Sequence, residues 1–317
     1  MYFPLIRGKQ FELIALRDLS IQMADSRKIS PIIEPVKEAI SVLEKTLNVF
    51  IQYNINFTII LNPIEGELKG NKQQIIADFI KKNLNEYDNF QIGIYVKGEE
   101  DFKKQYQFAI DNNFHKSNFT LIHNEQLDNL EDINDFITNY GVIYNVINFD
   151  KVSKRYYRNF LKETIITLND AFRQQSRNSD YSNNTDEFFS EEYLYFKDDG
   201  FIGFSDYLTV GEPFSEGGFL PYAVVIHLTY PDQYQKIRIG HFVSNSNEDT
   251  VDIAGKFSEA LSKLISFLYN YPNFKTTAIS EFTDLYEKQH YPGLETIKKL
   301  SIVNHIELII QLLTNPK

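Results

Sequence analysis

The sequence of 317 residues contains no cysteine. Without cysteine the chain can form no disulfide, no zinc–thiolate site and no iron–sulfur cluster, and it has no thiol nucleophile. It also lacks long apolar runs, because no stretch approaches the roughly 18 uncharged residues of a membrane-spanning helix. The first residues are not a basic leader followed by an apolar segment. We therefore expect a soluble, cytoplasmic protein.

Basic residues are fewer than acidic ones. The 32 Lys and Arg residues stand against 43 Asp and Glu residues, for a net charge of −11 and a pI near 5.1. This balance disfavours a broad basic surface for nucleic acid. The densest basic cluster is Lys151, Lys154, Arg155 and Arg158. Its helical spacing with neighbouring aromatic residues favours a solvated helix face.

Several motifs of known chemistry are also missing. No strand is followed by Gly-x-Gly-x-x-Gly, and there is no P-loop and no Gly-x-Ser-x-Gly nucleophile turn. The absence of these motifs does not exclude a nucleotide-binding site of another type. The histidines form no H-x-H or H-x-x-x-H pair. We interpret His227 and His241, which fall in facing strands of a predicted hairpin, as cross-strand partners and not as metal ligands.

What the chain does contain is a repeated unit, in which a short apolar strand ends on a polar residue and an amphipathic helix follows. The clearest copy is 29–36, where Glu34 ends the apolar run and Pro35 stops the strand. Strands are predicted over 2–6, 29–35, 57–63, 91–97, 119–124, 142–149, 164–170 and 200–207. Helices are predicted between them over 8–23, 38–53, 72–84, 100–112, 130–140 and 151–161.

Eight strands joined by connections of crossover length favour a closed parallel barrel of the TIM-like (β/α)8 type, with an open doubly wound sheet as the alternative. We assign the barrel core to 1–210 and interpret 211–317 as an extension of the same domain. The extension should hold a hairpin over 223–230 and 236–243 and helices over 253–269, 276–287 and 293–313.

One segment breaks the repeat. Residues 173–190 are rich in Ser, Asn and Asp, and they cannot bury enough apolar surface to form a core element. A loop of this length is either disordered or a functional lid. A helix is expected around 187–195.

The strand ends of a parallel barrel converge on its C-terminal face, where active sites of this architecture lie. The catalytic candidates there are Glu34, Asp170 and Asp206, and the ligand-binding candidates are Arg7, Lys9, Asn62, Lys97, Arg173 and Tyr207. Carboxylates of Glu34, Asp150 and Asp206 are candidate ligands of a hard cation such as Mg²⁺ or Mn²⁺.

Each candidate also has a structural interpretation. Glu34 can form an ion pair with Arg7 or Lys9, Asp170 can cap a turn, and the Asn62 side chain can stabilise the turn before Pro63. Lys97 can be the solvated end of its strand.

Four stretches together resemble a known family. They are residues 2–17, which begin Tyr-Phe-Pro-Leu-Ile-Arg-Gly-Lys, then Pro-Ile-Ile-Glu-Pro at 31–35, Gly-Phe-Ser-Asp-Tyr at 203–207, and 222–227. The chain resembles the Beta protein family of phages and bacteria, in particular its shorter bacterial relatives, which are often encoded beside a small nuclease. The resemblance implies a barrel-like core in a mobile-element or anti-phage setting. The family-typical positions are Arg7, Lys9, Glu12, Glu34, Asp206 and Tyr207, with no established catalytic roles.

Two functions are therefore expected. In the first, the C-terminal face binds a charged, phosphate-bearing ligand and acts as a metal-dependent hydrolase. Arg7, Lys9 and Lys97 would hold the anion, and Glu34 and Asp206 would supply acid–base or metal groups. In the second, the protein is a non-enzymatic partner or regulatory subunit of a neighbouring nuclease, which it would bind through its acidic surface, the 173–190 segment or the C-terminal helices.

Overall fold

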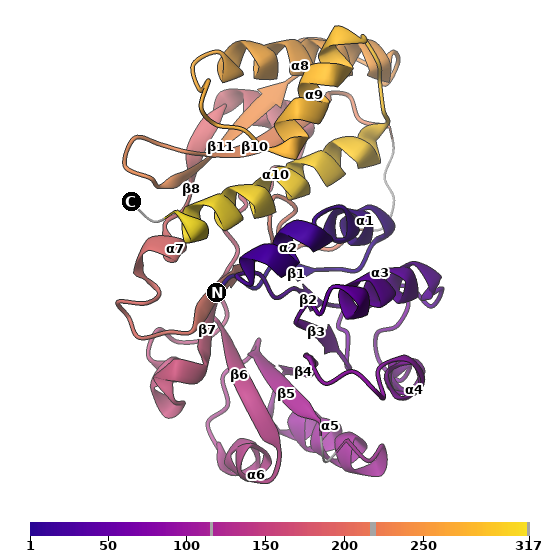
Figure 1. The fold of residues 1–317 in the computed structure, drawn as a ribbon, viewed down its shortest axis with the longest axis vertical. Helices are drawn as coiled ribbons and strands as arrows, with labels where there is room; N and C mark the ends of the chain where they lie inside the picture. The colour runs from indigo at the N-terminus through magenta and orange to yellow at the C-terminus, as the bar shows by residue number, and fades with distance from the viewer. Residues whose placement is uncertain (115–116, 216–219, 316–317) are drawn as a thin grey trace.

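Parallel strands form a nearly closed barrel in the computed structural model, which describes residues 1–114, 117–215 and 220–315 (Figure 1). The strands of the barrel are, in spatial order, β1 (Leu5–Ile6), β2 (Ile32–Ile33), β3 (Phe57–Ile60), β4 (Phe90–Val96), β5 (Asn118–His123), β6 (Gly141–Asn148), β7 (Ile165–Asn169) and β9 (Gly203–Asp206). Backbone hydrogen bonds close the circle: the N–H of Phe3 donates to Phe204 O over 2.9 Å, and the N–H of Phe204 donates to Met1 O over 3.1 Å. The predicted barrel is confirmed.

Helices cover the outside of the barrel where the apolar periodicity predicts them. They are α1 (Gln10–Asp18), α2 (Ser20–Ser26), α3 (Ser41–Gln52), α4 (Gln73–Asn83), α5 (Glu99–Asp111) and α6 (Glu131–Asn139). The sixth connection differs from the prediction over 151–161. It contains only the short 3₁₀ turns η1 (Tyr156–Asn159) and η2 (Lys162–Thr164), because the backbone is extended at Phe160. Tyr156 and Phe160 are nevertheless buried, as the apolar spacing suggested.

The pleat of the strands divides their side chains between the barrel interior and the layer of helices outside. Ile32 lies in the interior cluster, whereas Ile33 packs outward. The interior cluster consists of Phe3, Leu5, Ile32, Ile60, Tyr95, Ile122, Val146, Ile166, Leu168 and Tyr207. The same alternation, continued past the apolar residues, decides which polar side chains at the strand ends point into the barrel mouth.

A second, antiparallel sheet lies beside the barrel and contains an unexpected strand. The predicted hairpin is confirmed as β10 (Val225–Pro231) and β11 (Ile237–Val243). Its third strand is β8 (Asp186–Ser190), which pairs with β11. The prediction of a structureless 173–190 loop is therefore wrong: this segment holds η3 (Asn178–Asn183) and β8, and the helix that follows is only α7 (Glu192–Tyr195).

Three helices complete the extension: α8 (Ile253–Leu268), α9 (Thr277–Glu287) and α10 (Leu294–Thr314). Helix α8 packs on one face of the second sheet, where Phe267 contacts Tyr230 and Phe242. Helix α10 lies between the other face and the barrel helices α1 and α2 (Figure 1). Among the described residues, we find no helix with the length and apolarity that a membrane crossing requires.

Candidate functional site

Arg7 and Glu34 meet at the mouth of the barrel, at the C-terminal ends of β1 and β2. The Nη1 atom of Arg7 lies 3.1 Å from Oε2 of Glu34, and both side chains are buried. The Tyr95 hydroxyl donates a hydrogen bond to the same Oε2 over 3.1 Å. The Arg7 guanidinium lies over the Tyr207 ring, 5.0 Å from its centroid. Three predicted residues therefore come together, and Tyr95 joins them without having been predicted.

The other oxygen of Glu34 holds the β3–α4 connection against the mouth. Oε1 accepts hydrogen bonds from the backbone N–H groups of Ile64 at 2.8 Å and Glu65 at 3.1 Å. Every described contact of this carboxylate is thus made within the protein, and the side chain has no exposed surface. The structure shows Glu34 as part of a buried ion pair with Arg7, which was one of the two interpretations of the sequence.

The segment after β9 lies across the mouth and covers this ion pair. Nη2 of Arg7 donates to Glu212 O over 2.6 Å, and the N–H of Glu212 donates to Oδ2 of Asp170 over 2.9 Å. Nε and Nη1 of Arg7 are buried and donate no well-aligned hydrogen bond to the described residues, although Nη1 is within ion-pair distance of Glu34. Burial raises the pKa of Tyr207 and of Tyr95. The side chains of the mouth are therefore beyond the reach of a ligand in solution while 208–215 stays in place; they are Arg7, Glu34, Tyr95 and Tyr207.

Asp206 does not belong to the mouth, which corrects the expectation that it would act beside Glu34. Its side chain points to the outer layer, where Oδ1 accepts from the Tyr2 hydroxyl over 2.6 Å and Oδ2 lies 3.3 Å from Nε2 of His305. The ring of His305 is bonded in turn to Thr229 on β10, over 3.1 Å. Asp206 thus ties the barrel to α10 and the second sheet, because its neighbour Tyr207 occupies the inward position of the pleat.

The remaining strand-end residues have structural contacts. Asp170 accepts hydrogen bonds from the backbone of Phe172 and Glu212, and burial raises its pKa. The side-chain amide of Asn62 exchanges two hydrogen bonds with the backbone of Tyr95, at 2.8 and 3.0 Å. Lys97 is half-buried, and its Nζ lies 3.8 Å from the Asp101 carboxylate at the rim. The capping interpretation describes Asp170, whereas the Asn62 side chain joins β3 to β4 instead of stabilising the turn before Pro63.

The expected three-carboxylate metal site is not formed. Asp150 is exposed and accepts a hydrogen bond from the N–H of Asp170 over 2.7 Å, whereas Glu34 is buried and Asp206 faces outward. Among residues 1–114, 117–215 and 220–315, no group of three or more His, Asp or Glu side chains has a geometry that could hold a metal ion. The pleat separates these carboxylates although all follow apolar runs.

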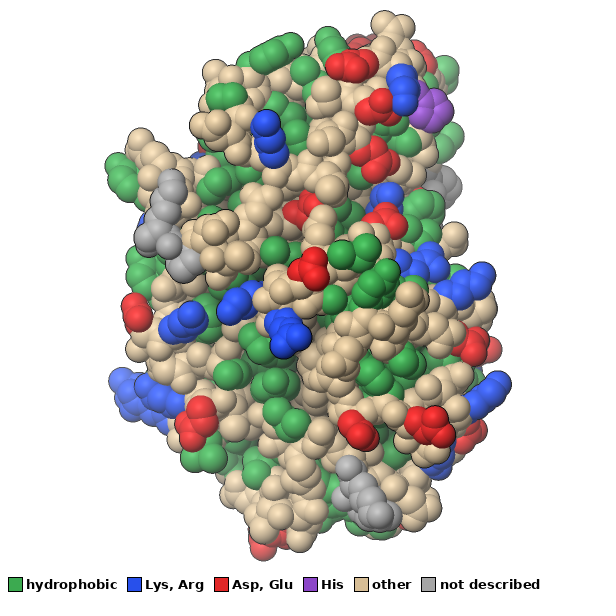
Figure 2. Space-filling view, viewed as in Figure 1, with side chains coloured by type: hydrophobic (Ala, Val, Ile, Leu, Met, Phe, Trp, Pro, Cys, Tyr) green, Lys and Arg blue, Asp and Glu red, His purple; other side chains and the backbone are tan. Residues whose placement is uncertain are grey.

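A groove of about 1530 Å³ opens beside the covered mouth, between α1, α10, β10 and residues 174–181. The basic side chains that line it are Lys9, Lys37, Arg177, Lys298 and Lys299, and the acidic ones are Glu12, Glu67 and Glu295. Basic side chains thus outnumber acidic ones around the groove. Three of them form ion pairs: Lys37 with Glu67 at 2.9 Å, Lys298 with Glu295 at 3.4 Å and Lys299 with Asp18 at 3.0 Å. Figure 2 shows one face of the molecule, over which basic and acidic side chains are both distributed.

Two basic groups of the groove differ in their surroundings. Nζ of Lys9 donates to Ser215 O over 2.7 Å and lies 4.6 Å from the centroid of the Phe214 ring, and partial burial lowers its pKa. The Arg177 side chain is exposed, and its guanidinium has no partner among the described residues. Lys9 is thus held in place by contacts with 214–215, whereas the guanidinium of Arg177 is available to a ligand.

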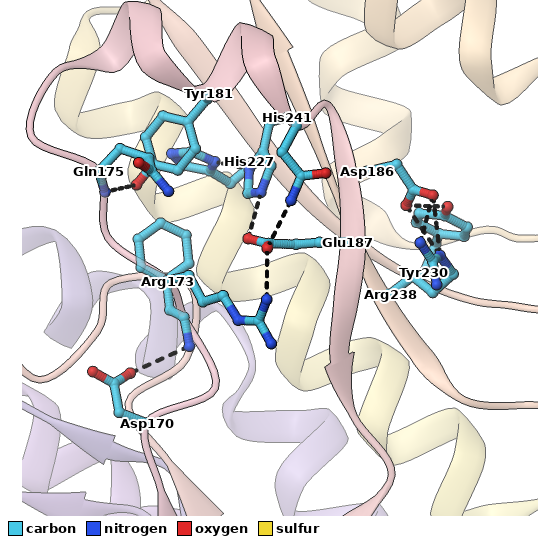
Figure 3. A network of polar contacts seen from close by, with 12 residues as sticks. Asp170, Arg173, Gln175, Tyr181, Asp186, Glu187, His227, Tyr230, Arg238 and His241 are labelled. Atoms are coloured by element: carbon cyan, nitrogen blue, oxygen red, sulfur yellow. Dashed lines mark hydrogen bonds and ion pairs between the residues drawn. The ribbon is translucent and has the colours of Figure 1, made fainter.

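A polar network on the second sheet reaches the same groove through His227, which is half-buried. His227 and His241 are paired across the two strands, which confirms the cross-strand interpretation, and their Nδ1 atoms lie 2.7 Å apart. Nε2 of His241 lies 3.2 Å from Oε1 of Glu187 on β8. The predicted ligand residue Arg173 also belongs here, since its Nη1 lies 3.5 Å from Oε2 of Glu187 (Figure 3).

Glu187 was missed because it lies in the segment that the sequence predicted as a loop. A signal was present: Glu187 and Phe189 alternate with exposed Asp186 and Phe188, as in a strand with one buried face. A carboxylate at an inward position of such a strand requires a partner, and His241 supplies it.

No protein-family model matches this chain. No curated protein sequence matches it either. The resemblance to the Beta protein family therefore stays a prediction.

Helix α10 does not provide the exposed apolar patch that would have favoured binding of a partner nuclease. Helix α10 is buried on several sides between the second sheet and α1. A large apolar patch on this helix would have favoured the partner hypothesis, and α10 presents none among its described residues.

Proposed function

We propose that this protein binds a small phosphate-bearing ligand in the groove beside the C-terminal face of its barrel. The observation that supports this most is the excess of basic side chains in the groove, on a chain with a net charge of −11. Because acidic residues dominate the composition, five Lys and Arg side chains around one concave surface are not explained by the average charge of the chain.

The chemistry of these side chains suits a phosphate group. A guanidinium presents its N–H groups as a fork that matches two phosphate oxygens, and an ammonium acts as a compact positive charge. Arg177 supplies such a fork from the 174–181 wall. Lys9, just before α1, supplies an ammonium group, and so does Lys298 on α10, whose Nζ lies 3.4 Å from Glu295 Oε1. A ligand with two phosphate groups would bridge these walls.

A divalent cation can accompany such a ligand without a cage of protein carboxylates. Mg²⁺ commonly binds through substrate phosphates, keeps several waters and uses only one or two protein ligands. The proposal therefore retains Mg²⁺ or Mn²⁺ as a component that enters with the ligand. The resemblance to the Beta protein family adds a bacterial anti-phage or mobile-element setting to it.

Calorimetry with inorganic pyrophosphate, with and without Mg²⁺, tests this proposal. We expect binding that weakens as the salt concentration rises, because exposed charges are screened. We also expect Arg177→Gln to weaken binding by about tenfold, since one charge-assisted hydrogen bond to phosphate contributes on the order of 1.5 kcal/mol.

The matched control is Arg155→Gln, which changes an exposed arginine outside the groove. If Arg155→Gln weakens binding as much as Arg177→Gln does, the ligand is attracted by overall charge and the groove proposal is wrong. If pyrophosphate does not bind but a nuclease co-purifies with the protein, the partner function replaces it.

A further inference from the structure

The protonation pattern of the histidine pair follows from its hydrogen bonds. A carboxylate only accepts, so Glu187 requires a proton on Nε2 of His241. A neutral His241 then has a bare Nδ1, which accepts the Nδ1–H of His227 over 2.7 Å. A neutral His227 in turn has a bare Nε2. The chain of contacts from Glu187 thus determines which nitrogen of His227 is unprotonated.

The surroundings of His227 keep it neutral and fix its ring. Tyr181 contacts the ring at a centroid distance of 4.7 Å and Phe172 at 5.0 Å, both edge to face. Burial lowers the pKa of His227 well below 6.5, and the neighbouring His241 lowers it further. Burial also lowers the pKa of His241, although Glu187 opposes that shift.

The bare nitrogen has no hydrogen-bond partner among the described residues, and His227 lines the groove. Glu187 is itself held by further donors, Asn184 Nδ2 at 3.0 Å and Arg173 Nη1 at 3.5 Å (Figure 3). The arrangement has the order of a hydrolytic triad without its nucleophile: a carboxylate orients one imidazole, which orients a second one at the edge of a ligand groove.

We propose that His227 is the general base of a phosphoester hydrolase, positioned by His241 and Glu187, and that it acts on the ligand of the groove. This inference rests on the proposed function, because the basic side chains would hold the phosphoester close to His227. The two histidines lie on β10 and β11 of the second sheet, and neither belongs to the interior cluster of the barrel.

In the proposed step, Nε2 of His227 accepts a proton from a water molecule as the water oxygen forms a bond to phosphorus. The bond between phosphorus and the leaving oxygen breaks, and the proton then passes from Nε2 to that oxygen, which leaves as an alcohol. Phosphate and alcohol are the products, and no oxidant or reductant takes part. While His227 carries the extra proton, the positive charge is shared with His241 and balanced by Glu187.

Hydrolysis of p-nitrophenyl phosphate and bis(p-nitrophenyl) phosphate by the full-length protein, with and without Mg²⁺, tests the inference. We expect turnover that His227→Gln lowers by about 100-fold or more, as for loss of a general base. The turnover rates of His241→Gln and Glu187→Gln should lie between those of His227→Gln and the wild type. The control His290→Gln, at an exposed position outside the groove, should keep the wild-type rate.

A positioning role makes a second prediction, for the dependence of the rate on pH. The charged and titratable groups around His227 are His241 on β11, Tyr181 on η3 and Glu187 on β8, with Arg177 in the groove. The rate should fall on the acid side as His227 is protonated. His241→Gln should move this fall to higher pH, because it removes the group that lowers the pKa of His227 by charge repulsion.

The inference is overturned if the wild type hydrolyses neither compound, or if His227→Gln hydrolyses them at the wild-type rate. Long-range ¹H–¹⁵N NMR at neutral pH provides a check that needs no substrate: His227 should have a protonated Nδ1 and a bare Nε2, and the opposite tautomer contradicts the proposal. Pyrophosphate binding by His227→Gln separates the two proposals. If this variant binds pyrophosphate and the wild type shows no turnover, the ligand site stands and the general base does not.

Discussion

Asp206 and Tyr207 are neighbours in the chain, yet their side chains serve opposite layers of the protein. Tyr207 lies inside the barrel beneath the Arg7 guanidinium, whereas Asp206 is bonded to Tyr2 and His305 in the outer layer. A single step along β9 therefore separates the polar cluster of the mouth from the contacts that hold α10. The predictions below test the two sides of this division separately.

On the inner side, Glu34→Gln should lower the free energy of unfolding by about 3 to 5 kcal/mol, because it leaves the buried charge of Arg7 without a counter-charge. Urea unfolding followed by circular dichroism measures this loss. The double variant Arg7→Met/Glu34→Gln should recover part of the stability. A double variant less stable than Glu34→Gln alone would show that Arg7 stabilises the mouth in some other way.

On the outer side, Asp206→Asn should cost about 1 to 3 kcal/mol, since one of its buried hydrogen bonds to Tyr2 or His305 becomes unfavourable. Because Asp206 does not line the groove, pyrophosphate should bind this variant with the wild-type Kd. Calorimetry on the folded variant decides the point. If pyrophosphate binding weakens as much as in Arg177→Gln, Asp206 contributes to the ligand site after all.

The connection that Glu34 holds over the mouth depends on Gly66, whose φ is +74°. A Cβ atom here would lie 2.3 Å from Val36 O, whereas Gly70, with a φ of +79°, has nothing within 4 Å of an added Cβ. Gly70→Ala should therefore cost only the left-handed backbone conformation, about 1 kcal/mol. Gly66→Ala should cost more than twice as much. Equal melting temperatures for the two variants would contradict the close packing of Gly66 on Val36, in the segment after β2.

Lowering the pH should decrease the free energy of unfolding, and His123 should account for part of this decrease. Its ring lies outside the barrel against Phe160, and burial lowers its pKa from 6.5 to about 4. Between these two values the unfolded chain binds a proton that the folded chain does not, so the free energy of unfolding falls as the pH is lowered from about 6.5 to about 4. The full contribution is about 3 kcal/mol.

His227 and His241 act in the same direction, so only part of the slope belongs to His123. In His123→Gln the decrease in unfolding free energy between neutral and acid pH should be smaller than in the wild type. Urea unfolding at several pH values measures it. An unchanged slope would show that His123 is already protonated in the folded protein.

Much of the barrel could be predicted because its signal is local. Each strand is a short buried run, and most helices have a single apolar stripe. The order of elements therefore follows from the sequence alone. The positions of the polar side chains at the strand ends were harder to predict, because an apolar run does not show which of its last residues faces the barrel interior. At β2 the inward position fell on Glu34, and at β9 it fell on Tyr207 instead of Asp206.

The groove could not be predicted, since its walls come from segments far apart in the chain. Arg177 lies in a stretch with the composition of a loop, and Lys298 lies on the last helix. The histidine pair was predicted from the hairpin register, but its carboxylate partner was not. Glu187 reaches His241 only because β8 leaves the barrel and joins the other sheet, which is a tertiary event with no periodic pattern of its own.

The position of β8 also has a consequence for synthesis of the chain. During translation β9 emerges soon after β8 and can close the barrel, whereas β11, with which β8 pairs, emerges much later. Until then β8 is an unpaired strand that carries the apolar side chains of Phe188 and Phe189. Asp186 and Glu187, which later bind Arg238 and His241, place two negative charges at its start and oppose pairing between nascent copies.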